Sequence, residues 1–197
     1  NPDHEKYIAK AATARGFHTT ASSELLPEHR EFERMSTTAV NAYVSPPTTE
    51  YLSNLDRGLN LTHRITLRIM QSNGGSISPA HASREAVRTV LSGPAAGVVG
   101  AFAEAAEAGI EKIITFDMGG TSADVSLCPA RLLERAELSI DGMPIRTPAI
   151  DVHTIGAGGG SIGWFDSGGA LRVGPQSAGA DPGPAASPPA PRCRGSG

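Results

Sequence analysis

Two aspartates, two glycines and two hydroxyl side chains gather in the eight residues Asp117-Met-Gly-Gly-Thr-Ser-Ala-Asp124. Glycine has no Cβ, so its backbone can approach an anion closely and turn its amides toward it. Asp117 could hold Mg²⁺ through water or orient an attacking water, and Asp124 adds a second acid after the turn. This collection suits a metal–phosphate group, with four candidate ligands for the phosphate: Gly119, Gly120, Thr121 and Ser122.

A simpler interpretation of the same stretch is a tight hairpin in which the aspartate and the threonine cap the turn. Apolar β-forming residues flank the turn on both sides, in KIITFDM before it and ADVSL after it, and predict two strands. An Asp-x-Gly-Gly-Thr motif is short, so the residues alone leave both interpretations open.

A second glycine-rich stretch occurs at residues 154–163, TIGAGGGSIG, and places Gly158, Gly160 and Gly163 in G-x-G-x-x-G spacing. A dinucleotide-binding fold needs a helix directly after these glycines, whereas SIGWFDSGGALRVG predicts a strand, a turn and a strand. No Lys-Ser or Lys-Thr follows, which excludes a Walker A loop. Contact with a nucleotide by another geometry and a closely packed chain crossing both remain open, and the candidate nucleotide-binding residues are Gly156, Gly158, Gly159 and Gly160.

Asp151 and His153 alternate on a predicted strand and would face the same side of it. They could bind a metal or transfer protons beside the glycines, or form a hydrogen-bonded structural pair. The single tryptophan, Trp164, is expected in the core.

Helices and strands alternate along the chain in a way that predicts an α/β fold with a mixed sheet. We expect helices at 3–15 and 95–108, a helix that starts at Pro46-Pro47, and a strand at Val87–Leu91. We divide the chain into a first part at 1–110, a second part at 111–181 that carries both glycine motifs, and a Pro/Gly/Ala-rich tail at 182–197 that we expect to be disordered.

The composition of the chain argues against several classes of partner and site. The chain has 197 residues, 39% of them hydrophobic, and a formal net charge of −3, which gives no reason to expect nucleic acid or an acidic membrane as partner. The two cysteines form no disulfide framework or metal-ligand spacing. A cytoplasmic, reduced protein is the expectation, and the lack of an initiator Met suggests a piece of a longer chain.

Several stretches together resemble the hydantoinase A/5-oxoprolinase family, which includes ATP-dependent N-methylhydantoinases, 5-oxoprolinases and acetone carboxylase subunits. The stretches that carry the resemblance occur in this order and span most of residues 1–185: REFERMSTTAVNAYV, IMQSNGG, LSGPAAGVVGA, FDMGGTSADVSL and DVHTIGAGGGSIGWFD.

The resemblance implies an actin-like ATPase fold of RNase-H-like topology, which closes on ATP and Mg²⁺. It implies that Asp117 is a catalytic residue that handles the metal or its water, that the turn after it cradles the β- and γ-phosphates, and that the loop at Gly156–Gly160 lies at the nucleotide. In such enzymes ATP activates a cyclic amide for attack by water. A small cyclic amide as substrate, a companion B-type subunit and an oligomeric full-length protein are further expectations.

The sequence departs from the family pattern in two places. Family members are several times longer, and a lobe with its own Asp/Gly/Gly/Thr hairpin should precede residue 1. After GADPGPA the chain continues as ASPPAPRCRGSG, which does not follow the family. We therefore expect a fragment that hydrolyses little or no ATP alone, with a non-catalytic remnant and a carboxylase subunit as alternatives.

Overall fold

The structure is a computed structural model that describes residues 1–62, 66–140, 142–179 and 183. The chain divides into two compact units, the first made of Asn1–Ala103 with Leu132–Asp151 and the second of Glu104–Arg131 with Val152–Gly197. The boundary expected after residue 110 lies close to the point, between Ala103 and Glu104, where the chain first passes from the first unit to the second. Residues 132–151, assigned to the second part from the sequence, pack with the first unit. The predicted disordered tail, apart from Gly183, lies outside the described residues.

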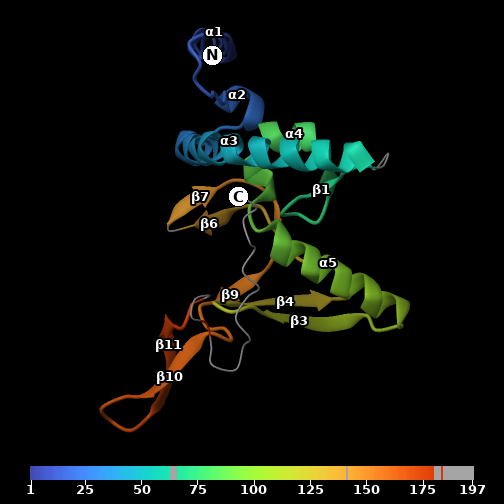
Figure 1. The fold of residues 1–197 in the computed structure, drawn as a ribbon, viewed down its shortest axis with the longest axis vertical. Coiled ribbons are helices and arrows are strands. Elements are labelled where there is room, and N and C mark those ends of the chain that lie inside the picture. The colour runs from blue at the N-terminus through green and yellow to red at the C-terminus, as the bar shows by residue number, and fades with distance from the viewer. Residues whose placement is uncertain (63–65, 141, 180–182, 184–197) are drawn as a thin grey trace, which may run out of the picture. The chain divides into compact units, whose positions relative to one another are not determined.

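The first unit is built on one long helix, α3, with α4 alongside it (Figure 1). The helix α5 starts in this unit and its last residues belong to the second. The helices are α1 (Pro2–Thr13), α2 (Ser22–Leu25), α3 (Glu31–Thr62), α4 (Pro79–Arg84), the 3₁₀ helix η1 (Ala86–Thr89) and α5 (Ser92–Glu107).

Short antiparallel hairpins and ladders complete the first unit: β1 (Ile69–Met70) with β2 (Ser76–Ile77), β5 (Glu134–Arg135) with β8 (Ala149–Ile150), and β6 (Leu138–Ile140) with β7 (Met143–Ile145). Their apolar side chains meet those of α2, α3 and η1. The core that results consists of Leu25, Val87, Leu138, Ile145 and Ala149, with Val40 and Ile140 packed against it.

The structure corrects the expected helix start at Pro46-Pro47, because both prolines lie inside the continuous helix α3. Proline lacks the N–H that a helix interior uses and normally breaks it. Here the side chains of Asn41, Ser45 and Leu52, on either side of the proline pair, are buried. Tertiary packing therefore continues the helix through a local sequence that would end it.

The strand expected at Val87–Leu91 is also wrong, since most of that stretch forms η1 and a turn. Val87 is fully buried, so its β-branched side chain serves the core from a helical turn. The helices expected at 3–15 and 95–108 are confirmed as α1 and α5.

The second unit carries a three-stranded antiparallel sheet in the order β3-β4-β9 and a separate hairpin, β10–β11 (Figure 1). The strands are β3 (Lys112–Met118), β4 (Ala123–Pro129), β9 (His153–Ile155), β10 (Ser161–Phe165) and β11 (Leu171–Ser177). The two strands predicted around the first glycine motif are confirmed as β3 and β4. The α/β class is confirmed, and every strand pair among the described residues is antiparallel.

The three-stranded sheet has one face that carries carboxylates and one apolar face, because successive side chains of a strand point to opposite sides. Asp117 and Asp124 are on the first face. The second carries large apolar side chains that are 45–71% exposed: Ile114, Phe116, Met118, Leu127 and Ile155.

The sequence predicted Trp164 in the core, and this prediction is wrong. Trp164 lies on the exposed hairpin β10–β11, 45% accessible, and its indole Nε1 donates to the carbonyl oxygen of Gly174 at 2.8 Å. None of the helices in the described part of the chain combines the length and apolar character that a bilayer crossing requires.

Candidate functional site

The tip of the β3–β4 hairpin is a four-residue turn with unused backbone donors. Gly119 closes it by donating its amide to the carbonyl oxygen of Ser122 at 2.9 Å. The next three amides, those of Gly120, Thr121 and Ser122, have no acceptor among the described residues. A Cβ at Gly120 would meet no atom within 4 Å, so the space beside this backbone is open. Consecutive free amides of this kind favour an anion.

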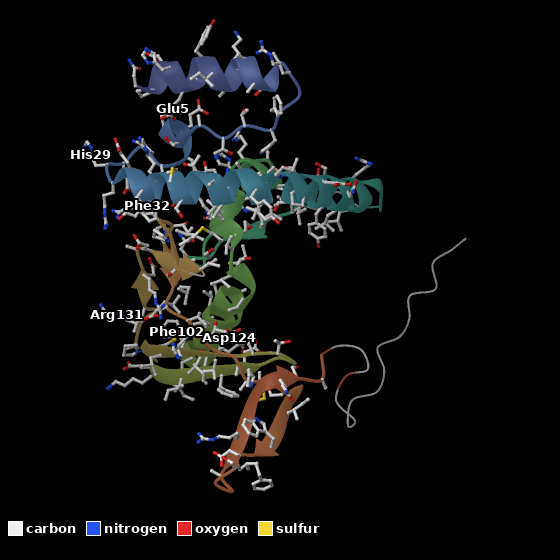
Figure 2. The ribbon with its side chains drawn as sticks, turned by 90° about the vertical axis from the view of Figure 1, so that its left-hand side faces the viewer. Glu5, His29, Phe32, Phe102, Asp124 and Arg131 are labelled. Atoms are coloured by element: carbon white, nitrogen blue, oxygen red, sulfur yellow. The ribbon has the colours of Figure 1, made fainter. Side chains whose placement is uncertain are left out.

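Two carboxylates lie directly opposite each other beside this turn. Asp117 on β3 pairs with Asp124 on β4 in the antiparallel register, and Asp124 pairs in turn with Thr154 on β9. Directly opposed side chains share one face of a sheet. The three therefore form a row across the sheet, on which Figure 2 labels Asp124.

Thr154 fixes one of the two carboxylates. Its hydroxyl donates to Asp124 Oδ1 at 2.6 Å, a short bond as expected for a charged acceptor. Within the described residues no group donates to Asp124 Oδ2 or to either carboxylate oxygen of Asp117. Like charges directly opposite each other destabilise a sheet, so this row is an arrangement that a bound cation would stabilise.

The glycine-rich loop packs against the tip of the same hairpin. The amides of Gly159 and Gly160 donate to the carbonyl oxygens of Gly119 and Gly120, at 2.9 and 2.7 Å. The structure thus brings the two glycine motifs together, although some 40 residues separate them in the sequence.

Close packing explains why this loop needs glycine. A Cβ on Gly158 would lie 2.6 Å from the carbonyl oxygen of Gly119 and 2.8 Å from Ser122 N, and one on Gly160 would lie 2.8 Å from the carbonyl oxygen of Gly120. The backbone amides of Gly159 and Gly160 already donate to carbonyl oxygens of the turn, so they are not available to bind a phosphate. Gly156 has open space around it, and nucleotide contact by the loop stays a prediction.

The G-x-G-x-x-G spacing is not that of a dinucleotide fold, as predicted. The loop leads into β10, a turn at Asp166–Gly169 and β11, with no helix after the glycines. The turn is held by Asp166, whose Oδ1 accepts from the amides of Gly168 and Ala170.

Asp151 and His153 do not form one site on a strand. Asp151 belongs to the first unit and forms an ion pair with Arg135. His153 is in β9 of the second unit, directly opposite Val125, and so projects from the apolar face of the sheet. Among the described residues no group of three or more His, Cys, Asp or Glu side chains is arranged to hold a metal ion.

Cys128 lies on β4, on the same face of the sheet as Asp124, but takes no part in the site. It is buried, and desolvation raises the pKa of its thiol, with a hydrogen bond to Ser126 acting in the opposite direction. A thiol with a raised pKa is a poor nucleophile.

The sequence predicted the turn and the position of Asp117 beside it, but gave no sign of the hydrogen bond from Thr154 to Asp124. The position of Thr154 directly before the glycine-rich loop was visible in the sequence. The register of β9 on β4, which brings it opposite Asp124, was not.

Solved structures share this fold. The ATP-dependent caprolactamase of Pseudomonas jessenii matches with a TM-score of 0.74 at 38% identity, over 93% of this chain and 27% of the caprolactamase chain. Nucleotide-free acetone carboxylase matches with a TM-score of 0.74 at 28% identity, over 90% of this chain and 26% of its own.

The 5-oxoprolinase of Saccharomyces cerevisiae is 39% identical over 94% of this chain, which spans only 14% of the yeast protein. The chain is therefore a fragment in relation to these proteins. The family model described as hydantoinase/oxoprolinase matches residues 34–189, a stretch that contains the hairpin, the carboxylate row and the glycine-rich loop. The chain belongs to the hydantoinase/oxoprolinase family.

Proposed function

We propose that this chain is the phosphate-binding part of an ATP-dependent enzyme that opens cyclic amides, and that it acts within a longer protein with an actin-like ATPase fold. The single observation that carries the proposal is the hairpin tip, where three consecutive amides that find no acceptor among the described residues stand beside the exposed carboxylate of Asp117. The 38% identity to an ATP-dependent caprolactamase supports the reaction class.

The residues present fit a nucleotide phosphate with Mg²⁺. Carboxylate oxygens are ligands that Mg²⁺ prefers, often with intervening water, and Asp117 and Asp124 offer oxygens that no described residue occupies. The open space at Gly120 leaves room for phosphate oxygens at the turn. Bound Mg²⁺ would neutralise charge on the transferring phosphoryl group.

The chain's own residues then have distinct tasks. The amides of Gly120, Thr121 and Ser122 donate to phosphate oxygens, and the hydroxyls of the last two add further donors. Asp117 holds the metal or its water. The glycine-rich loop keeps the turn in place through its two hydrogen bonds to the turn carbonyls. Because phosphoryl transfer needs positioning and charge stabilisation more than covalent chemistry, these tasks suffice for one side of an ATP site.

Titration calorimetry of the 197-residue chain with Mg-ATP tests the proposal. We expect binding that Asp117→Asn weakens about tenfold, as the loss of a charged contact implies. ATP affinity measured without Mg²⁺ should change much less. Thr115→Val, which removes a hydroxyl from the same face of β3, is the matched control. A folded chain that binds no Mg-ATP, or binds it equally well after Asp117→Asn, would point to a non-catalytic remnant.

A carboxylase subunit is the second candidate, favoured by the equal TM-score of the acetone carboxylase structure. Turnover by the full-length protein separates the two. ATP hydrolysis that depends on a lactam, hydantoin or 5-oxoproline supports the hydrolase, whereas dependence on a ketone with bicarbonate supports the carboxylase.

A further inference from the structure

We infer that Thr154 is a positioning residue of the phosphate site and that Asp124, which it holds, is a second carboxylate directed at the same metal–phosphate group as Asp117. The inference rests on the proposed function and extends it from one acid to a fixed pair. Its starting point is the row of three opposed residues on β3, β4 and β9.

The row places its members close to one another without any ligand. Directly opposed residues in an antiparallel pair have Cβ atoms about 4.5–5.5 Å apart, so the Asp117 and Asp124 carboxylates can reach one common cation. Two acids at this separation repel each other when both are ionised. The opposed pair therefore lowers the stability of the sheet, and local features that lower stability are concentrated at functional sites.

The hydrogen bond from Thr154 selects an orientation for one acid. With Oδ1 of Asp124 engaged by the hydroxyl at 2.6 Å, Oδ2 is the oxygen without a donor among the described residues. A half-buried aspartate without a partner can still sample more than one rotamer, and a partner that fixes one of them raises metal affinity, as hydrogen-bonded ligands generally do. Thr154 belongs to a short strand that leads into the glycine-rich loop, so the loop and Asp124 are fixed by the same segment.

The test measures metal affinity rather than turnover. The 197-residue chain is saturated with ADP, and Mn²⁺ binding is followed by electron paramagnetic resonance of the free ion. Thr154→Val keeps the β-branched shape that suits a strand but removes the donor, and we expect Mn²⁺ to bind about tenfold more weakly. Thr154→Ser restores the donor and should bind Mn²⁺ nearly as the wild type does. The affinity for ADP in the presence of EDTA should stay the same in all three.

The outcomes separate a positioning role from a structural one. Equal losses in Thr154→Val and Thr154→Ser, or a parallel loss of metal-free ADP affinity, would overturn the positioning role. Should Thr154→Val not fold, Asp124→Asn decides, since its amide oxygen can still accept from Thr154 while the charge is gone. Unchanged Mn²⁺ affinity in that variant overturns the inference.

The same experiment distinguishes this inference from the proposed function. If Asp117→Asn weakens nucleotide-dependent Mn²⁺ binding while Thr154→Val and Asp124→Asn leave it intact, this inference is wrong and the proposed function stands. If the wild-type chain shows no such binding, both are wrong. Thr115→Val again serves as the control, because it removes a hydroxyl from the same face that bonds only weakly, at 3.5 Å, to the carbonyl oxygen of Ser126.

Discussion

The backbone amide of Gly160 donates to the carbonyl oxygen of Gly120 at 2.7 Å and ties the glycine-rich loop to the tip of the β3–β4 hairpin. The carbonyl oxygen of Gly160 accepts in turn from Ala178 N at 2.7 Å, just beyond β11. The loop thus connects the hairpin tip with the end of the last strand. Substitutions in it should act through packing, and substitutions at the tip through ligand binding.

Gly158→Ala should destabilise the second unit. The new Cβ would lie within 3 Å of backbone atoms of Gly119, Gly120 and Ser122, none of which can rotate away. We expect a loss of about 1–3 kcal/mol in the free energy of unfolding, the usual cost of overpacking. Denaturant titration measures it, and Gly156→Ala, where the Cβ meets no atom within 4 Å, is the control. Equal stability of the two variants would contradict the packing of loop on turn.

Gly120→Ala should have the opposite profile. A Cβ added at Gly120 meets no atom within 4 Å. The free energy of unfolding should therefore change by no more than about 0.5 kcal/mol, as for an ordinary surface substitution. Mg-ATP affinity should fall, because a methyl group then occupies the approach to the free amides. Calorimetry and thermal unfolding together give the answer, with Gly163→Ala on β10 as the binding control. Full affinity in Gly120→Ala would move the phosphate away from this turn.

Asn41→Leu should be among the most destabilising changes in the first unit. The fully buried side chain donates to the carbonyl oxygen of Arg84 at 2.9 Å and accepts from Val87 N at 3.0 Å. Leucine leaves both backbone groups buried without partners, at about 1–3 kcal/mol each. A loss of about 2–6 kcal/mol is therefore expected by chemical denaturation. Asn54→Leu, on an exposed position of the same helix, should differ little from the wild type.

Attachment of α1 should depend on pH. The helix has no buried residue, and Glu5 connects it to α2 (Figure 2) by accepting from Ser23 N at 2.9 Å and from the Ser22 hydroxyl at 3.0 Å. The backbone hydrogen bond from Ser23 is the main cause that lowers the pKa of Glu5 below 4.5, followed by the opposing effect of burial and by the hydroxyl of Ser22.

A lowered pKa means that the folded state favours the ionised carboxylate, so this stabilisation is present above pH 4.5 and is lost as the pH falls through the lowered pKa. Hydrogen exchange of the α1 amides should accelerate in that range. In Glu5→Gln it should be fast at neutral pH as well and nearly independent of this titration. Slow exchange in the variant would assign the attachment to other contacts.

Local signals predicted the hairpin well because they act between near neighbours. Apolar alternation before residue 118 and after residue 122, with two glycines between, left little choice of structure or register for β3 and β4. The position of Asp117 beside the turn followed directly. That part of the site could be predicted from the sequence.

Distant packing decided what the sequence could not show. Helix α3 continues through its two prolines because neighbouring side chains such as those of Asn41 and Leu52 are buried against the rest of the first unit. Val87 lies in a helical turn because its side chain packs in the core from that position. Likewise, the reason for glycine at Gly158 lies at Gly119, far along the chain. Motif spacing alone cannot distinguish glycine that admits a ligand from glycine that admits another segment.

The alternation along β3 and β4 also constrains how this hairpin can change in evolution. Inserting or deleting one residue within either strand exchanges its two faces. Such a change would turn Phe116 and Met118 toward the position of the carboxylates and Asp117 toward the apolar side. Related genes should therefore tolerate many replacements at exposed positions of these strands while keeping the number of codons within each strand constant.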